Sequence, residues 1–500
     1  MILINSSQKN AAKMFQSFMP VYVPIGIGYL AAVMEREHFP FKIIDEQVED
    51  DTFGKISEYV CSPYLPVTHP YIFAFSVLTA SYKIALETAK KVKEIYPDSV
   101  IIFGGPHPSA LPEEVLMNPQ VDIVIKGEGE LILPELYWRI KGRQDYSDIK
   151  GISFRKGSEI VHNDRSTEIV DLDTLLPFPY HLFDIKLGYD MGFIVSSRGC
   201  PFNCIFCSNR VTTGKKYRYL SPENTVKELE LLYKNYHPKM VLFLDDNLLV
   251  NHDRIYRLMD LIKEKGLHKK MRFSFQARGD SVNYTLLKDL YESGFKSVFF
   301  GLETSSEDIM KIIRKGETVA ECITAVKMAK DIGFHVSATF IYGLPTETHQ
   351  VRMECARLAN ELEIDMIRFN NATPYPGTEL YDIAKRECRL NIQGVYENFN
   401  SVSTFIESPF HPTLFSYVPE NNSEEEIRND IMLSYFMFYL DLKKIKRMFF
   451  KQYEGVSWFN LGEGYFNRIK KVPPLIVVSF YMIIKFLKLV VFNIKKLFFS

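Results

Sequence analysis

Short apolar runs alternate with helical patterns along most of this chain, and this alternation constrains the fold more than any other feature of the sequence. Five such runs fall within the first 130 residues and six more between residues 193 and 376. They are rich in Ile, Val and Phe, residues that favour β-strands. Neighbouring parallel strands need a crossover connection, usually a helix, so each series predicts a parallel sheet covered by helices.

The first series predicts a doubly wound, flavodoxin-like α/β domain over residues 1–145. Polar residues and glycines follow its third, fourth and fifth strands. Open α/β sheets bind ligands at the carboxyl ends of their strands, so we expect a ligand there. The strand candidates are "MILINSS", "FKIIDEQ", "YIFAFSVLT", "VIIFGGPH" and "VDIVIKGEG", and the helical patterns are Ile25–Glu37, Tyr82–Tyr96, Leu111–Met117 and Leu131–Ile140.

The second series predicts a partial (β/α)6, TIM-like barrel over residues 189–400, with its active site at the carboxyl ends of the strands. Residues 146–188, with a predicted hairpin at "RKGSEIV", are interpreted as a linker, and residues 401–500 as a helical C-terminal region. The strand candidates of the barrel are "FIVSSRG", "VLFLDDN", "FSFQARG", "SVFFGLET", "VSATFIYGLP" and "MIRFNNATPYP".

The last segment, "PPLIVVSFYMIIKFLKLVVFNIKKLFFS", predicts an amphipathic helix with a narrow cationic stripe. On a helix, Lys485, Lys488, Lys495 and Lys496 fall within about 100° of arc. Two interpretations account for this pattern equally well. One is an interfacial membrane anchor, and the other is a helix packed on the barrel exterior or in a dimer interface. A transmembrane span is disfavoured because Lys485 and Lys488 interrupt the apolar run.

The charge balance and the cysteine count bear on partners and location. Sixty basic residues against 61 acidic ones give no reason to expect nucleic acid as a partner. The odd number of cysteines, seven, and the lack of a secretory signal pattern at "MILINSS" predict reduced thiols in a cytoplasmic protein.

Three of the seven cysteines, Cys200, Cys204 and Cys207, lie within eight residues directly after the first barrel strand. A structural zinc site needs four ligands, and no second Cys or His pair has a suitable spacing. A ferredoxin cluster also takes four cysteines. Three thiolates can hold three irons of a cubane and leave the fourth without a protein ligand. An open coordination position characterises a catalytic metal site, so these cysteines are predicted to be metal ligands.

The CxxxCxxC spacing, with Phe206 before the last cysteine and on the first βα loop of a parallel barrel, resembles the radical S-adenosylmethionine (radical SAM) superfamily. The resemblance implies a 4Fe-4S cluster whose free iron binds the amino and carboxylate groups of S-adenosylmethionine. It also implies an external electron donor, whose electron passes through the cluster and cleaves the sulfonium to a 5′-deoxyadenosyl radical.

Later strand ends match further motifs of the superfamily and imply where S-adenosylmethionine binds. "LFLDDN" takes the place of the motif that contacts the methionyl amino group, "GLET" ends the fourth strand, and "FIYGLPTET" resembles the motif near the adenine. Arg278 either meets the carboxylate of S-adenosylmethionine or pairs with Asp280. The implied cofactor-binding residues of the barrel are Phe206, Asp245, Asp246, Asn247, Arg278, Glu303, Gly343 and Leu344.

The first domain is similar to the cobalamin-binding domain of cobalamin-dependent radical SAM enzymes. The resemblance rests on "PIGIGYLAAVMEREHFPFKIID", "FSVLT", "FGGPHPSALPEE" and "DIVIKGEGE". Glycines at strand ends let a bulky macrocycle approach the backbone closely. The Asp-x-His-x-x-Gly motif of the cobalamin mutases is absent, so we expect no histidine ligand from that motif, and His107 is expected only to line the site. The implied cobalamin-binding residues are Ser76, Leu78, Thr79, Gly104, Gly105, His107, Gly127 and Glu128.

Together the resemblances imply a cobalamin-dependent radical SAM enzyme, with C-methylation of an unactivated carbon as the favoured reaction. A cobalamin-dependent oxidative cyclase or ring-rearranging enzyme needs the same cofactors, and a non-catalytic, metal-stabilised interaction protein is a further alternative. The sequence identifies no catalytic side chain. We expect a small-molecule substrate, and the apolar tail alone suggests a lipid or isoprenoid met through peripheral membrane contact.

Overall fold

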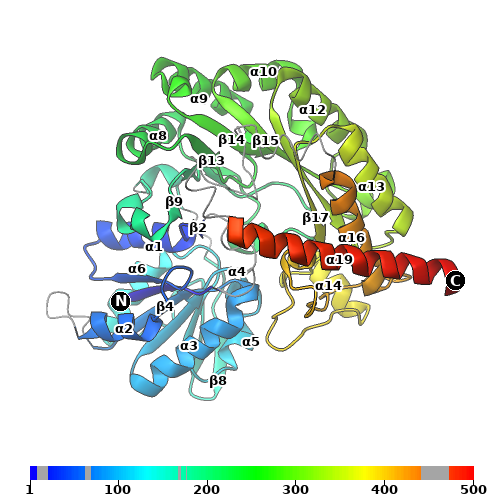
Figure 1. Cartoon of the computed structure of the whole chain (residues 1–500). Helices are drawn as coiled ribbons and strands as arrows, with labels where there is room; N and C mark the ends of the chain where they lie inside the picture. The colour runs from blue at the N-terminus through cyan, green and yellow to red at the C-terminus, as the bar shows by residue number, and fades with distance from the viewer. Residues whose placement is uncertain (8–20, 62–68, 167–169, 176, 441–471, 500) are drawn as a thin grey trace.

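The computed structural model describes residues 1–7, 21–61, 69–166, 170–175, 177–440 and 472–499. Two sheets with packed helices follow one another along the chain. Figure 1 shows the first, in blue and cyan, below the second, in green, with the carboxyl-terminal helices beside the second.

The first sheet places five parallel strands in the order β3-β1-β4-β5-β6. Along the chain these are the second, first, third, fourth and fifth strands of the predicted series, so the flavodoxin-like arrangement is confirmed. The strands are Ile2–Asn5 (β1), Lys42–Asp45 (β3), Ile72–Ser76 (β4), Val100–Gly104 (β5) and Ile123–Ile125 (β6).

Helices cover both faces of this sheet because its strands carry buried apolar side chains on both sides. α1 and α6 pack on the face that carries Leu3 and Ile102, and α2, α3 and α5 pack on the face of Ile4 and Phe103. The sequence pattern did not predict α2. The helices are Ile25–Arg36 (α1), Thr52–Val60 (α2), Tyr82–Ile95 (α3), Pro112–Leu116 (α5) and Ile132–Lys141 (α6).

The hairpin predicted for the linker forms and adds two strands to the first sheet. β7 (Ile152–Lys156) pairs antiparallel with β6, and β8 (Glu159–His162) pairs antiparallel with β7. This part of the predicted linker therefore belongs to the first sheet.

The second sheet has six parallel strands in chain order. Among the described residues the first and last of these strands do not pair with each other, so the predicted partial barrel is confirmed. The strands are Phe193–Ile194 (β10), Met240–Phe243 (β13), Arg272–Ala277 (β14), Phe295–Glu303 (β15), His335–Tyr342 (β16) and Met366–Asn371 (β17). The helices that connect them are Pro222–Tyr236 (α8), His252–Glu264 (α9), Tyr284–Glu292 (α10), Val319–Ile332 (α12) and His349–Glu361 (α13).

The C-terminal region packs on the β17 side of this barrel. α16 (Glu424–Tyr439) contacts both α13 and β17. The backbone N–H of Phe369 on β17 donates to the hydroxyl of Tyr435 on α16 at 3.0 Å. The last helix, α19 (Val472–Phe499), crosses α16 and packs against it (Figure 1).

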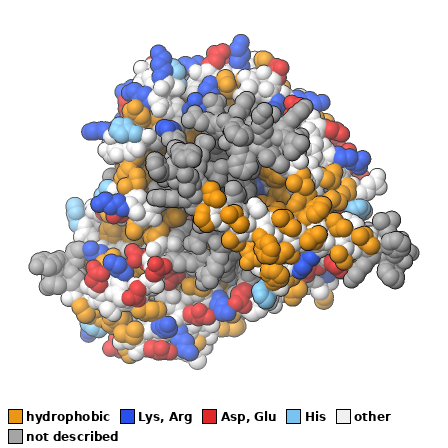
Figure 2. Space-filling model, viewed as in Figure 1, with side chains coloured by type: hydrophobic (Ala, Val, Ile, Leu, Met, Phe, Trp, Pro, Cys, Tyr) orange, Lys and Arg blue, Asp and Glu red, His pale blue; other side chains and the backbone are white. Residues whose placement is uncertain are grey.

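The helix predicted for the tail forms as α19. Its Leu489 packs against Met432 and Phe436 of α16, while a large apolar face points outward (Figure 2). Lys485 is buried, so this lysine of the predicted cationic stripe faces the protein and not the surroundings. Residues 472–494 are long and apolar enough to cross a membrane, judged by length and composition alone.

Candidate active site between the two sheets

A cavity of about 350 Å³ opens between the carboxyl ends of the first sheet and the first loop of the barrel. The carboxyl ends of the first sheet and of the first two barrel strands, β10 and β13, therefore face one space. The first domain lines it with strand ends and with one side of α1, and the barrel contributes Val195, Ser197, Arg198, Thr212, Thr213, Leu244 and Asp246. This cavity is not lined by the predicted site residues Cys200, Cys204, Cys207, Phe206, Arg278, Glu303, Gly343 and Leu344.

Small residues shape the wall that the first sheet contributes. Residues of β4, β5 and β6 line the cavity, and at the strand ends this lining reaches Ser76, Gly104 and Gly127. A Cβ placed on Gly104 would meet no atom closer than 3.9 Å, so a larger side chain there would fill the cavity. Such a cradle fits a bulky macrocycle that approaches the backbone, as predicted for cobalamin.

Gly105 and Leu78 also line the cavity, for different reasons. Gly105 has a φ of +101°, and a Cβ there would lie 2.9 Å from the carbonyl oxygen of Val77. The turn after β5 therefore requires glycine. The Leu78 side chain is 55% exposed, which suits contact with an apolar part of a ligand.

His107 and Thr79 do not line the cavity, contrary to the prediction for both residues. The turn after β5 continues into a short helix, α4 (Pro106–Ala110), which directs His107 into the core. There its ring lies 4.1 Å from the ring of Tyr82 and 4.9 Å from that of Tyr396, measured between centroids. Burial lowers the pKa of His107 to about 3. Within the described part of the chain, no histidine lines this cavity.

Asp246 is the acidic residue of the barrel wall. It follows β13 and accepts hydrogen bonds from the Gly199 N–H at 2.9 Å and the Asn209 side-chain amide at 2.6 Å. The Thr213 hydroxyl donates to it at 3.2 Å. Burial raises the pKa of Asp246. A carboxylate held at the cavity wall fits the amino group of S-adenosylmethionine, as predicted.

Asp245 and Asn247, predicted to bind S-adenosylmethionine beside Asp246, do not reach the cavity. Asp245 is buried and accepts three hydrogen bonds at 2.6–2.7 Å, from the backbone N–H and hydroxyl of Ser196 and the hydroxyl of Ser197. It therefore anchors the start of the cysteine loop. The Asn247 side chain caps the next turn by accepting from the Leu249 N–H.

The three predicted metal ligands lie on the loop between β11 (Ser197–Arg198) and α7 (Asn209–Thr212), partly exposed and as free thiols. Burial raises the pKa of each thiol, that of Cys207 to about 11, while nearby Lys315 and Arg278 oppose the rise at Cys204. The aromatic ring of Phe206 packs against the barrel core.

This loop fits an iron–sulfur cluster better than a single ion. In the described ranges, no three Cys, His, Asp or Glu side chains are grouped so that they could hold one metal ion. A cubane binds each cysteine through a different iron, so its ligands stand apart. Cys200, Cys204 and Cys207 would hold such a cluster.

Arg278 takes the second of its two predicted roles. Its guanidinium donates to both carboxylate oxygens of Asp280, at 2.9 and 2.7 Å, and to the carbonyl oxygen of Lys315 at 2.6 Å. It also lies over the ring of Phe202, 3.5 Å from the centroid. These contacts make Arg278 a support for the cysteine loop.

Glu303 lies at the end of β15, in a left-handed conformation with a φ of +61°. Its Oε1 accepts from the buried Lys315 Nζ at 2.8 Å, and Lys315 also lies 3.2 Å from Glu317. The other oxygen, Oε2, is buried without a hydrogen-bond partner among the residues described. An unpaired buried acceptor fits a hydroxyl or amino group of a bound ligand.

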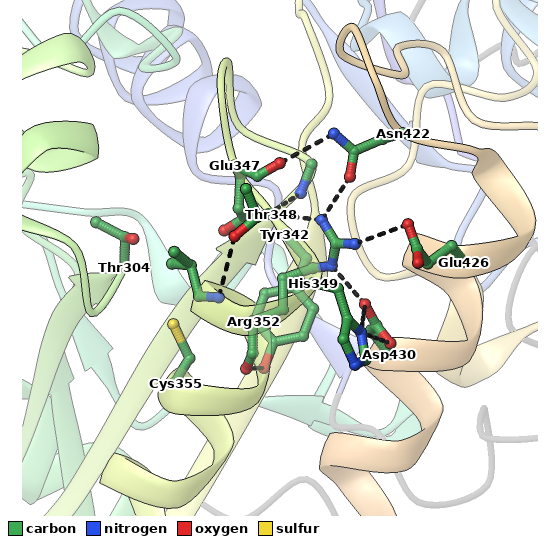
Figure 3. Close-up of polar contacts among 12 residues, drawn as sticks. Thr304, Tyr342, Glu347, Thr348, His349, Arg352, Cys355, Asn422, Glu426 and Asp430 are labelled. Atoms are coloured by element: carbon green, nitrogen blue, oxygen red, sulfur yellow. Dashed lines mark hydrogen bonds and ion pairs between the residues drawn. The ribbon is translucent and has the colours of Figure 1, made fainter.

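Gly343 and Leu344 form the turn after β16. Figure 3 shows the polar contacts beside this turn, which join Arg352 of the barrel to Asn422, Glu426 and Asp430 of the C-terminal region. The Gly343 N–H donates to the Glu347 carboxylate at 2.5 Å. Burial raises the pKa of Glu347 to about 8. Arg352, fully buried, lies 3.7 Å from Glu347 and donates to Asp430 of α16 at 2.6 Å. The sequence did not indicate a role for Asp430, because no local pattern shows that it contacts Arg352, which lies far away along the chain.

Arg198 joins the two domains, a role that the sequence pattern did not indicate. Its guanidinium lies 2.7 Å from Glu130, 3.2 Å from Glu128 and 4.5 Å from the ring centroid of Tyr29. Glu128 also accepts from Arg218 at 2.7 Å. Glu128 thus lines the cavity, as predicted for a ligand contact, with its carboxylate paired to two arginines.

Two family models match the chain: the Radical SAM superfamily over residues 194–359 and the B12 binding domain over residues 14–137. An uncharacterized methyltransferase of Pyrococcus horikoshii is 34% identical over 367 residues, which cover 72% of this chain and 78% of the relative. The anaerobic magnesium-protoporphyrin IX monomethyl ester cyclase of Cereibacter sphaeroides is 25% identical over 431 residues, which cover 83% of this chain and 67% of the cyclase.

Solved structures share the fold. The cobalamin-dependent S-adenosylmethionine radical enzyme OxsB, solved with aqua-cobalamin and S-adenosylmethionine bound, aligns with a TM-score of 0.67 at 19% identity, over 87% of this chain and 65% of OxsB. The radical S-adenosylmethionine methyltransferase TsrM from Kitasatospora setae, solved with cobalamin and a 4Fe-4S cluster, aligns with a TM-score of 0.62 at 16% identity, over 79% of each chain.

Proposed function

Because this chain belongs to the radical SAM enzymes that also bind cobalamin, we propose that it transfers a methyl group from S-adenosylmethionine to an unactivated carbon of a small molecule. Its cofactors are a 4Fe-4S cluster, S-adenosylmethionine and cobalamin. When bound, they supply a carrier for the methyl group and a radical that removes a hydrogen atom from the substrate. Amino-acid side chains alone cannot perform this chemistry.

The cavity lined by both domains carries this proposal. Gly104 lies on the wall of the first sheet and Asp246 on the wall of the barrel. Methyl transfer to a carbon radical needs the carrier and the radical source to face one substrate, because effective concentration depends on geometry. A common space between two cofactor sites meets this need.

In this proposal, the residues of the chain bind and orient the cofactors. Cys200, Cys204 and Cys207 hold the cluster, and Asp246 accepts hydrogen bonds from the amino group of S-adenosylmethionine. The small residues at the ends of β4, β5 and β6 admit the edge of cobalamin. Arg198, paired with Glu128 and Glu130 across the domain junction, keeps the two walls at a fixed separation.

An anaerobic assay tests the function. The protein is loaded with iron, sulfide and cobalamin, given a chemical reductant in place of the physiological electron donor, and mixed with methyl-labelled S-adenosylmethionine. We expect 5′-deoxyadenosine together with label on cobalamin. If a protein shown to be folded and fully loaded gives neither product, the proposed function is wrong.

An oxidative cyclase or ring-rearranging enzyme is the second candidate, because a relative named as a cyclase matches 83% of this chain. Such an enzyme uses the same cofactors but transfers no methyl group, because cleavage of S-adenosylmethionine to the 5′-deoxyadenosyl radical releases methionine with its methyl group still on the sulfur. In the same assay it would give 5′-deoxyadenosine from cobalamin-loaded protein while the cobalamin never gains label.

We further propose that the substrate is a lipid or isoprenoid that a cytoplasmic enzyme meets at a membrane surface. The support is the apolar face of α19, which points away from the protein. The loaded enzyme is incubated with labelled S-adenosylmethionine and a lipid extract, and the products are partitioned. Label in the organic phase is expected. Label that stays in the aqueous phase with every extract, while an aqueous substrate is methylated, would contradict a lipid substrate.

A further inference from the structure

Two lysines of the last helix contact the protein. Lys485 is buried, and its Nζ donates to the carbonyl oxygens of Thr404 and Phe405, at 2.8 and 2.9 Å. The ammonium of Lys488, one turn further, donates to the carbonyl oxygen of Pro409. Lys485 is thus bound to carbonyl groups of α15 (Ser403–Ile406), and Lys488 to a carbonyl group just after it.

The opposite face of α19 is apolar and exposed (Figure 2). Ile476, Phe480, Ile483 and Leu487 recur every three or four residues, and each is 57–64% exposed. Among the described exposed side chains of the helix, Ser479, Lys488 and Asn493 are polar, and the others are aliphatic or phenyl groups. The exposed large apolar residues of the helix are Val472, Ile476, Val477, Phe480, Ile483, Phe486, Leu487, Val490, Val491 and Ile494.

This arrangement is the reverse of the usual one for a helix at a protein–water boundary, where apolar side chains face the core and charges face solvent. The apolar face is also long. Twenty-eight residues at 1.5 Å per residue give a helix of about 42 Å. An exposed apolar surface of this extent marks a site of interaction with a membrane or another protein.

The chemistry of the face favours hydrocarbon as its partner. Energetically dominant contacts between proteins are enriched in Trp, Tyr and Arg, whereas the exposed side chains here are Ile, Val, Leu and Phe. Residues 472–494 of the helix are also long and apolar enough to cross a membrane, judged by length and composition alone.

Contacts in the middle of α19, from Tyr481 to Leu489, hold the helix against the protein. Leu489 packs with Met432 and Phe436 of α16, and the Phe436 and Phe486 rings lie 5.2 Å apart. Nearer its start, the rings of Tyr481 and Phe410 lie 6.0 Å apart. A helix held at both places lies in the plane of a membrane and does not cross it.

We propose that the outward face of α19 inserts into one leaflet of a lipid bilayer at interfacial depth, while Lys485 and Lys488 fasten the helix to the protein. This deepens the membrane contact proposed above by assigning its surface and orientation. Vesicle binding is measured without any enzymatic reaction. A protein that does not bind vesicles would therefore contradict the membrane proposal and leave the proposed reaction untouched.

Flotation of the full-length protein with vesicles tests the proposal. We expect it to float with neutral phosphatidylcholine vesicles in high salt, because apolar insertion is not screened. The double substitution Ile476→Asp and Ile483→Asp should weaken binding at least about tenfold. The matched control, Ile95→Asp and Met117→Asp, changes two apolar residues of the first domain that are 54% and 65% exposed, and should float like the wild type.

Two results would overturn the proposal. One is binding only to anionic vesicles that is lost in high salt. The other is no flotation from a protein that forms a stable dimer broken by the same α19 substitutions, which would identify a second copy as the partner. If the aspartate variant does not fold, Phe480→Trp keeps the test available. Its fluorescence should be quenched by vesicles with brominated acyl chains, and unchanged fluorescence would contradict insertion.

Discussion

The two walls of the central cavity are built on different physical principles. The wall of the first sheet ends in small residues, Ser76, Gly104 and Gly127, and offers room. The barrel wall and the loops beside it are held by fixed charges and hydrogen bonds, such as those of Asp246 and of the buried Lys315 between Glu303 and Glu317. The space that small side chains leave at the first wall selects a bulky ligand by its shape. The preorganised polar groups of the barrel wall select a small charged ligand.

The largest expected effect comes from removing a ligand of the cluster. Cys204→Ala should abolish cluster assembly and all cleavage of S-adenosylmethionine, because two thiolates cannot hold the site. Cobalamin binding should persist, because the glycine wall is untouched. Iron content, 5′-deoxyadenosine and the cobalamin spectrum are measured on one preparation. Cleavage that survives with iron still bound would show that the cysteine assignment is wrong.

Removing one buried charge tests how far the stability of the barrel depends on its paired charges. Lys315→Met leaves the carboxylates of Glu303 and Glu317 buried without their cation, which should cost about 3–5 kcal/mol of unfolding free energy. Chemical denaturation measures this loss. The double variant Lys315→Met with Glu303→Gln should recover part of it, and no recovery would argue that packing of Lys315, not its charge, matters.

A larger side chain at Gly104, on the wall of the first sheet, tests whether the space at this wall is needed to bind cobalamin. Gly104→Phe should lower the affinity for cobalamin at least about tenfold while the iron–sulfur spectrum stays intact, since the new ring occupies the cavity. Gly104→Ala is the matched control, because a Cβ there meets no atom closer than 3.9 Å. Equilibrium dialysis with cobalamin measures both variants. Equal affinity of the phenylalanine variant and the wild type would exclude this wall as the cobalamin site.

The smallest effect is expected where the two walls meet. Glu128→Ala leaves Arg218 without its carboxylate while Arg198 keeps Glu130, so we expect a loss of about 1 kcal/mol. Glu135→Ala, which breaks the exposed pair with Arg139 on the surface, should cost less than about 0.5 kcal/mol. Thermal unfolding compares them. Equal losses would mean that the Glu128 pairs do not hold the domains together.

Local patterns predicted most of the architecture. The alternation of strands and helices gave both sheets and the strand order of the barrel, because hydrophobic periodicity is a local property. The cysteine spacing likewise placed the cluster loop without knowledge of the fold.

What the sequence did not predict depends on contacts between distant segments. Asp245 and Asp246 are neighbours, yet only the loop geometry turns one into the Ser196 anchor and the other toward the cavity. The glycines beside His107 predict that it lines the site, but Tyr82 and Tyr396 enclose it. The direction of Lys485 depends on carbonyl groups about 80 residues away along the chain.

One spectroscopic measurement tests the central claim that both cofactors face a single cavity. With cobalamin in its cobalt(II) state and the cluster reduced, each carries an unpaired electron, and pulsed electron paramagnetic resonance detects dipolar coupling between them. We predict coupling in the fully loaded enzyme, and its loss in Gly104→Phe as cobalamin is excluded. Absence of coupling, with both cofactors shown to be bound in the paramagnetic state, would contradict the shared site.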